Sequence, residues 1–323
     1  MHLRRVFAYA QTSPACENRA FVTQLVQTEP RVARPASAFV SAVPSWRAGV
    51  LTFLCLWLYW STLARLVGQW WHDPNFSHGF FVPLFTGFVL WQERDRLARL
   101  PTKPSWSGLV LLILALLLLI VGQFGAEIFL ARSSFVLLLA GLTILFLGWN
   151  VFRAVLFPWA FLFLMIPIPA IIFNEITFPL QLLASQVSAA TLPLLGVPIL
   201  REGNVINLPS MALEVAEACS GIRSLMSLLT LAIIYGYLME RRVWVRWLLA
   251  VAAVPIAVAA NSVRIIGTGL LVQYWDADKA EGYFHASWGW IIFVASLLML
   301  YGLHALIRVI WPDRPEKNRG EQA

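Results

Sequence analysis

The run Trp106-Ser-Gly-Leu-Val-Leu-Leu-Ile-Leu-Ala-Leu-Leu-Leu-Leu-Ile-Val-Gly-Gln-Phe124 indicates the fold class, because it carries no charged side chain. A helix needs about 20 apolar residues to cross the hydrocarbon core of a bilayer. Comparable runs recur along the chain, which is 59% hydrophobic and 13% charged and has a mean hydropathy of +0.71. Soluble domains carry about 25% charged residues. We therefore expect an all-α membrane protein, a polytopic bundle of about eight transmembrane helices.

Seven further apolar segments complete the expected bundle. They cover about residues 48–67, 80–91, 134–149, 154–173, 219–239, 247–271 and 286–310. The segment 154–173 contains three prolines, and since proline removes a backbone donor we expect this helix to be bent. Residues 174–196 mix polar and apolar side chains, which favours an amphipathic helix on the membrane surface but leaves open whether they cross. Residues 197–213 indicate short strand-like pieces joined by turns.

Polar tails flank this membrane domain. We expect residues 1–45 to form a disordered cytoplasmic tail, residues 46–311 the transmembrane domain, and residues 312–323 a second cytoplasmic tail. No apolar run lies near Met1, so we do not expect a cleaved signal peptide.

Basic residues indicate how the bundle is oriented. With the N-terminus inside and eight spans, most of the 24 Lys and Arg residues fall in cytoplasmic segments, and the outer loops hold only Arg132, Arg201 and Lys279. The positive-inside rule favours this arrangement. Both termini are then cytoplasmic, and the helix ends nearest Cys219 and His285 face the periplasm. The net charge of +7 is then explained by topology, and we expect no nucleic-acid partner.

Cys219 is the first candidate for chemistry. It lies within Glu214-Val-Ala-Glu-Ala-Cys-Ser-Gly-Ile-Arg223, where a polar loop is expected to become a membrane helix. Helix N-termini and nearby cations lower the pKa of a thiol and so favour the reactive thiolate. Arg223 would share a helical face with Cys219, and Ser220 follows it directly. Glu217 could favour the helix dipole, orient His285 or meet a basic group on the substrate, and the sequence leaves open whether Glu217 or His285 carries the proton.

The other cysteines point to no further chemistry. Cys16 lies in the N-terminal tail and Cys55 in an apolar helix, where a free cysteine acts as a small hydrophobic residue. The three cysteines show neither metal-ligand spacing nor a plausible disulfide framework.

Arg264 is the second candidate, because it falls inside an apolar segment. An arginine there costs roughly 2.5–3.5 kcal/mol on insertion scales, so it usually has a partner and a function. Asn261 lies three residues earlier and shares its helical face. The guanidinium could stabilise a thiolate or an oxyanion. The alternative is an arginine that snorkels to the outer interface.

Histidines supply the remaining candidates. His285 lies at a loop-to-helix junction and could act as a general acid or base, or it could be one more interfacial side chain. His72 and His78, with Asp73 nearby, are second candidates for the acid or base, or they could line a substrate cleft. A metal site at these three residues is a weaker alternative, because no further strong ligand is near. We expect no metal and no cofactor.

These motifs, taken in order, resemble those of a known family. Glu217-Ala-Cys-Ser-Gly-Ile-Arg223, then Asn261-Ser-Val-Arg264, then His285 ahead of Trp288-Gly-Trp290, are similar to the motifs of the exosortases. These are polytopic inner-membrane transpeptidases of Gram-negative bacteria, related to the archaeosortases. Asp73-Pro-Asn-Phe-Ser-His78-Gly also resembles the N-terminal region of the family. The resemblance covers roughly residues 50–310.

The resemblance implies a thiol protease or transpeptidase, a hydrolase acting on peptide bonds in protein sorting. Its substrates would be secreted proteins with a C-terminal Pro-Glu-Pro motif, an apolar span and a basic tail, known as PEP-CTERM proteins. Cys219 would be the nucleophile that forms a thioester, Arg264 the thiolate or oxyanion stabiliser, and His285 the acid or base. The acceptor of the cleaved protein, attached to the cell envelope, is unknown. The enzyme would lie in the bacterial inner membrane with its active site facing the periplasm.

Two other functions fit an apolar chain with one intramembrane arginine. A multi-span transporter would use Arg264 and the proline-rich segment, although the inverted repeats of many transporters are missing from the sequence. A structural component of an exopolysaccharide assembly system would need none of the three residues. Neither function requires Cys219.

Overall fold

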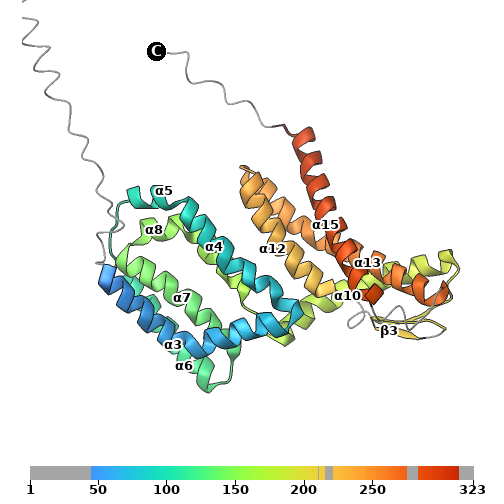
Figure 1. Cartoon of the computed structure of the whole chain (residues 1–323), viewed down its shortest axis with the longest axis horizontal. Coiled ribbons are helices and arrows are strands. Elements are labelled where there is room, and N and C mark those ends of the chain that lie inside the picture. Colours follow the sequence, from blue (N-terminus) through green and yellow to red (C-terminus); the bar gives the residue numbers. More distant parts are fainter. Residues whose placement is uncertain (1–44, 210, 215–220, 275–282, 313–323) are drawn as a thin grey trace, which may run out of the picture.

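The computed structural model describes residues 45–209, 211–214, 221–274 and 283–312 (Figure 1). These residues form helices and one small antiparallel sheet. Both expected tails lie almost entirely outside the described residues. A large part of the chemistry expected of residues 214–223 falls on positions 215–220, which also lie outside them.

One group of helices comes from the first half of the chain. In order, its elements are α3 (Ser45–His72), the 3₁₀ helix η1 (Pro74–Phe80), α4 (Phe81–Gln92), α5 (Arg94–Arg99), α6 (Ser107–Phe124) and α7 (Ile128–Phe146). Helices α6 and α7 form a tight antiparallel hairpin, because Gly108 lies directly against the α7 backbone at Gly141 and Leu145. Small residues allow such close approach between membrane helices.

Prolines interrupt the next segment, as expected for residues 154–173. It consists of α8 (Trp149–Ala154), α9 (Leu156–Phe161) and the 3₁₀ helix η2 (Leu162–Met165). Pro167 and Pro169 then separate η2 from α10 (Ala170–Thr191), so the expected bend is a complete break. A further 3₁₀ helix, η3 (Leu192–Leu195), follows α10.

A three-stranded antiparallel sheet follows, which confirms the strand-like pieces expected over residues 197–213. Its strands are β1 (Leu200–Glu202), β2 (Val205–Asn207) and β3 (Ala212–Glu214), in the order β1-β2-β3. Gly203 makes the β1–β2 turn with a positive φ of 66°, a conformation that glycine adopts without strain. The central residue Ile206 is fully buried and packs with Leu192 and Ile265. The sheet is thereby fixed against the second half of the chain.

A second group contains three long helices, α12 (Gly221–Met239), α13 (Val243–Tyr274) and α15 (Tyr283–Ile310). Their apolar faces share a buried cluster that includes Leu228, Leu249 and Leu300. In Figure 1 the α12–α13 junction and the C-terminal end of α15 lie on the same side of the molecule as α5. The α6–α7 turn, α10 and the sheet lie on the other side. The helix ends thus divide between two faces, as in a membrane bundle.

The helical membrane fold is confirmed, whereas the number of spans is approximate. Among the described residues, six helices are long and apolar enough to cross a bilayer: Gly49–His72, Ser107–Phe124, Ile128–Phe146, Ala170–Leu195, Val243–Tyr274 and Gly289–Ile310. Five match expected spans, and Ala170–Leu195 is the segment left open above. The expected spans over 80–91, 154–173 and 219–239 contain shorter or broken helices. At 1.5 Å per residue, the 12 residues of α4 cannot cross the core alone.

Candidate active site

Arg264 occupies the buried side of α13 and points at α15. Only 8% of its surface is exposed. A Cβ atom placed on Gly289 of α15 would lie 3.5 Å from both Cζ and Nη2 of Arg264 and 3.8 Å from Nη1. The guanidinium therefore lies in van der Waals reach of the α15 backbone. Such burial argues against an arginine that snorkels to the surface.

His285 belongs to the first turn of α15, which begins at Tyr283. Its side chain lies outside what the structure describes. Its position in the helix is nevertheless informative, because residues four apart share one helical face. Position 285 is thus one turn from Gly289, on the face of α15 that Arg264 contacts.

Cys219, together with Glu217 and Ser220, lies outside the described residues, so its place relative to Arg264 is still a prediction. The two ends of the undescribed segment 215–220 are placed, however. Strand β3 ends at Glu214 in a sheet that packs against Ile265, the neighbour of Arg264. Helix α12 begins at Gly221 and packs against α13. The segment that carries the cysteine is therefore bracketed by two elements that both contact α13.

Arg223 lies in the first turn of α12, as expected, and its side chain is exposed. The described contacts do not join it to Arg264. A supporting role for Arg223 is therefore still a prediction.

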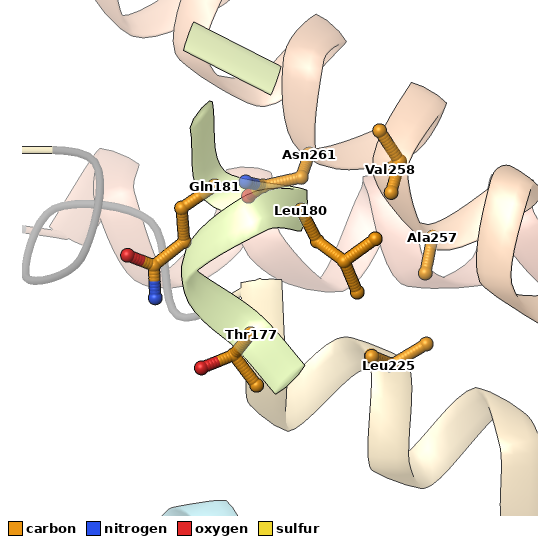
Figure 2. A pocket seen from close by; sticks show the side chains of 7 residues that line it. All are labelled: Thr177, Leu180, Gln181, Leu225, Ala257, Val258 and Asn261. Carbon is orange, nitrogen blue, oxygen red and sulfur yellow. The ribbon is translucent and has the colours of Figure 1, made fainter. Parts of the chain in front are cut away.

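Asn261 lies one turn before Arg264 on α13 and lines a small pocket between α10, α12 and α13 (Figure 2). The pocket measures about 20 Å³, which is room for one water molecule. Asn261 is 7% exposed, and its Oδ1 atom has no hydrogen-bond partner among the described residues. Figure 2 shows its side chain reaching from α13 toward α10 near Gln181. A buried carbonyl oxygen without a partner is costly, which marks this position as a polar site.

A second and larger cavity lies on α10 beside the sheet. It measures about 380 Å³ and is lined by Asn174, Glu175, Thr177, Phe178, Pro179, Gln181 and Asn204. Thr177 and Gln181 line both this cavity and the pocket at Asn261. The small pocket at Asn261 and the larger cavity are therefore neighbours on α10, at the same end of the molecule as the sheet (Figure 1).

His78 lies inside the first group of helices, and its expected role at a substrate cleft is still a prediction. It is buried, and its Nε2 atom lies 3.3 Å from the carbonyl oxygen of Leu164, in the packing of η1 against η2. The Nδ1 atom of His72 lies 2.8 Å from the carbonyl oxygen of Gly68 in its own helix. The two rings thus meet separate backbone groups, and no three His, Cys, Asp or Glu side chains cluster as a metal site within the described ranges.

Sequence reasoning did not single out Gly289, Gln181 or Thr177. Gly289 stands between two tryptophans, and a lone glycine among bulky residues of a membrane helix often marks close helix approach. The sequence therefore did contain a signal that could have identified Gly289. Nothing in the sequence pattern indicated that Gln181 and Thr177 would lie next to Asn261, because the contact depends on how α10 packs against α13.

Comparison with known families agrees with this picture. The model of the transmembrane exosortase family (Exosortase_EpsH) matches residues 70–302, which include η1 and all of α12 and α13. A search of curated proteins found no match, and neither did a search of solved structures. The family match spans well over half of the chain and contains Cys219, Arg264 and His285. The chain therefore belongs to the transmembrane exosortase family.

Proposed function

We propose that the chain is a cysteine transpeptidase or protease of the bacterial inner membrane that cleaves C-terminal Pro-Glu-Pro sorting signals of secreted proteins. Family membership supports protein sorting as the general role. The observation that carries the proposal is the buried guanidinium of Arg264 against α15, one turn from position 285. A buried cation at that place suits a reaction that creates negative charge.

The reaction would be acyl transfer through a thioester. The thiolate of Cys219 attacks the scissile carbonyl carbon, and the carbonyl electrons move to oxygen. Arg264 stabilises this oxyanion by donating N–H groups from its guanidinium. As the tetrahedral intermediate collapses, the C–N bond breaks and His285 protonates the leaving amine. An acceptor nucleophile then attacks the thioester, His285 accepts its proton, and Cys219 is released as the thiolate.

Burial makes Arg264 effective in this role. Its 8% exposure places the charge in a medium of lower dielectric constant than water, where it stabilises a nearby anion more strongly. The planar guanidinium offers several N–H donors in fixed directions. Asn261, on the same face of α13, would contact the substrate backbone or an ordered water beside it.

The distribution of charge supports the proposed orientation in the membrane. Arg94, Arg96 and Arg99 belong to α5, and Arg241, Arg242 and Arg246 cluster at the start of α13. These elements lie on one side of the molecule in Figure 1, whereas α10 and the sheet lie on the other. The positive-inside rule assigns the arginine-rich side to the cytoplasm. Cys219 would then face the periplasm, where secreted substrates present their sorting signals.

The test is processing of a secreted reporter that carries a Pro-Glu-Pro motif, an apolar span and a basic tail. Wild-type protein should shorten the reporter, and mass spectrometry of the new C-terminus should show either an attached acceptor or a free carboxylate. Cys219→Ala and His285→Ala should abolish processing at matched membrane levels. Cys55→Ala is the control, because this cysteine lies in α3 and should leave processing unchanged. A reporter that Cys219→Ala still processes would refute the thioester mechanism and favour a transporter or structural role.

A further inference from the structure

A second polar cavity lies in the first half of the chain, between α3 and the α6–α7 turn. It measures about 440 Å³ and is lined by Ser61, Thr62, Arg65, Gly122, Gln123, Ala126, Ile128 and Ala131. None of these residues belongs to α10, α12, α13 or α15, which form the candidate active site. The cavity is therefore a separate site.

Hydrogen-bond donors line this cavity. Thr62 is 2% exposed, and its hydroxyl has no partner among the described residues. Arg65 uses its Nε atom to donate to the carbonyl oxygen of Ser61 at 3.2 Å, which leaves the outer nitrogens of its guanidinium for a ligand. Gln123 adds an exposed amide. A buried hydroxyl and a guanidinium beside one cavity are suited to an anion.

A second arginine, Arg132, is buried in α7 next to one of the residues that line the cavity. Arg132 follows the lining residue Ala131 in α7 and is 4% exposed. Its Nη1 atom donates to Oε1 of Gln69 at 2.7 Å, while its buried Nε atom has no partner in the described parts of the chain.

Neither Arg65 nor Arg132 forms an ion pair with a carboxylate among the described residues. The carboxylates that form ion pairs within the described ranges belong to Asp95, Glu93 and Glu240, and their partners are Arg94, Arg96, Arg242 and His304. A buried arginine in a membrane helix is costly without a counter-charge. The sequence prediction of Arg132 as an outer-loop residue is also corrected, because α7 begins at Ile128 and includes it.

We propose that this cavity binds the phosphate group of an anionic phospholipid. Phosphate matches the planar fork of a guanidinium and accepts several hydrogen bonds at once. A lipid is the source that the surroundings favour, because large exposed apolar side chains lie at or next to the residues that line the cavity. Val121 and Ile128 are exposed beside it, and Phe124 is 90% exposed. Acyl chains would lie along this apolar surface of α6 while the headgroup enters the cavity.

The test measures binding to the full-length protein in detergent. Dihexanoyl-phosphatidylglycerol, dihexanoyl-phosphatidylcholine and inorganic phosphate are titrated while thermal unfolding is followed. We expect the anionic lipid to raise the unfolding midpoint at concentrations at least about tenfold lower than the zwitterionic lipid. Thr62→Val and Arg65→Gln should each weaken the anionic lipid about tenfold, since each removes a donor to a charged group. Arg99→Gln removes the same charge from exposed α5 and should change nothing.

Two results would overturn the proposal. Equal responses to both lipids, unchanged by Thr62→Val and Arg65→Gln, would show that the cavity recognises no anion. A midpoint shift produced by inorganic phosphate as effectively as by the anionic lipid, and lost in both variants, would assign a free-phosphate site instead.

Discussion

The guanidinium of Arg264 lies against Gly289, so that a side chain on α15 at this position would meet the arginine directly. The two residues come from helices joined through residues 275–282, and their contact holds a buried charge beside the helix that carries His285. Glycine leaves the space beside the guanidinium open, and a side chain larger than a methyl group would fill it. Gly289 is therefore a positioning residue for the proposed active site.

The size of the residue at position 289 should control activity. Gly289→Ala should process the reporter at close to the wild-type rate, because its Cβ would sit 3.5 Å from Arg264, an ordinary contact distance. Gly289→Leu should lower the rate at least about tenfold, because further atoms displace the guanidinium and overpacking costs typically 1–3 kcal/mol.

Gly302→Leu in the same helix provides the matched control, since a Cβ there would meet no atom within 4 Å. It should leave the rate unchanged. Normal processing of the reporter by Gly289→Leu, present in the membrane at wild-type levels, would contradict a positioning role for Gly289. A drop with Gly302→Leu as large as that with Gly289→Leu would point to a general defect of α15.

Replacing Asn261 with leucine can distinguish a role of this residue in activity from a role in stability. Asn261→Leu removes a buried carbonyl oxygen that has no partner among the described residues, so we expect the thermal midpoint to stay level or rise. The same change should lower the reporter-processing rate, because the substrate or an ordered water would lose its contact. The thermal midpoint and the reporter-processing rate should both be measured on the same preparation of each variant. A lower midpoint together with a normal rate would assign Asn261 to the fold alone.

Apolar runs were enough to predict the class of fold, and prolines were enough to predict the interruption before α10. Helix packing was harder to predict, because the lipid-facing and buried faces of a membrane helix are both apolar and show little periodicity. The contact of Arg264 with Gly289 and the small pocket at Asn261 both depend on that packing. The motifs pointed to Arg264 and Asn261 as unusual residues but could not identify what they touch.

The contacts at the junction of α12 and α13 could not be predicted from the sequence either. His304 gave no functional signal in the sequence, yet in the structure it belongs to a buried network. The Tyr235 hydroxyl lies 2.7 Å from Nδ1 of His304, and Nε2 lies 3.3 Å from Oε2 of Glu240. Arg242 donates to the same carboxylate through its Nη2 atom at 3.1 Å and its backbone N–H at 2.9 Å. The network ties α15 to the α12–α13 junction.

Glu240 should make stability depend on acid pH. Burial raises the pKa of its carboxyl group, but the hydrogen bonds from Arg242 and His304 outweigh burial and hold that pKa at about 2, below the ordinary 4.5. The unfolded chain binds the proton first, so this contribution is complete above pH 4.5 and is lost as the pH falls toward 2. Glu240→Gln should lower the free energy of unfolding by about 1.5–3 kcal/mol at pH 7.

Thermal unfolding in detergent from pH 7 to pH 2.5 provides the measurement. The gap between wild type and Glu240→Gln should narrow steadily below pH 4.5. Glu93→Gln, which disrupts the exposed pair with Arg96, should cost less than about 1 kcal/mol at every pH. A gap that stays constant down to pH 2.5 would mean that the Glu240 carboxylate adds no pH-dependent stability.

Gly108 should be required for the α6–α7 hairpin that closes one side of the proposed lipid site. A Cβ atom at this position would collide with the backbone nitrogen of Leu145 and lie 2.6 Å from the carbonyl oxygen of Gly141, and neither backbone can yield without separating the helices. Gly108→Ala should therefore lower the free energy of unfolding by about 1–3 kcal/mol. Gly87→Ala in α4 meets no atom within 4 Å and should be neutral or gain up to about 1 kcal/mol from helix propensity. Because both changes add one methyl group, equal midpoints for the two variants would contradict the close packing of α6 on α7.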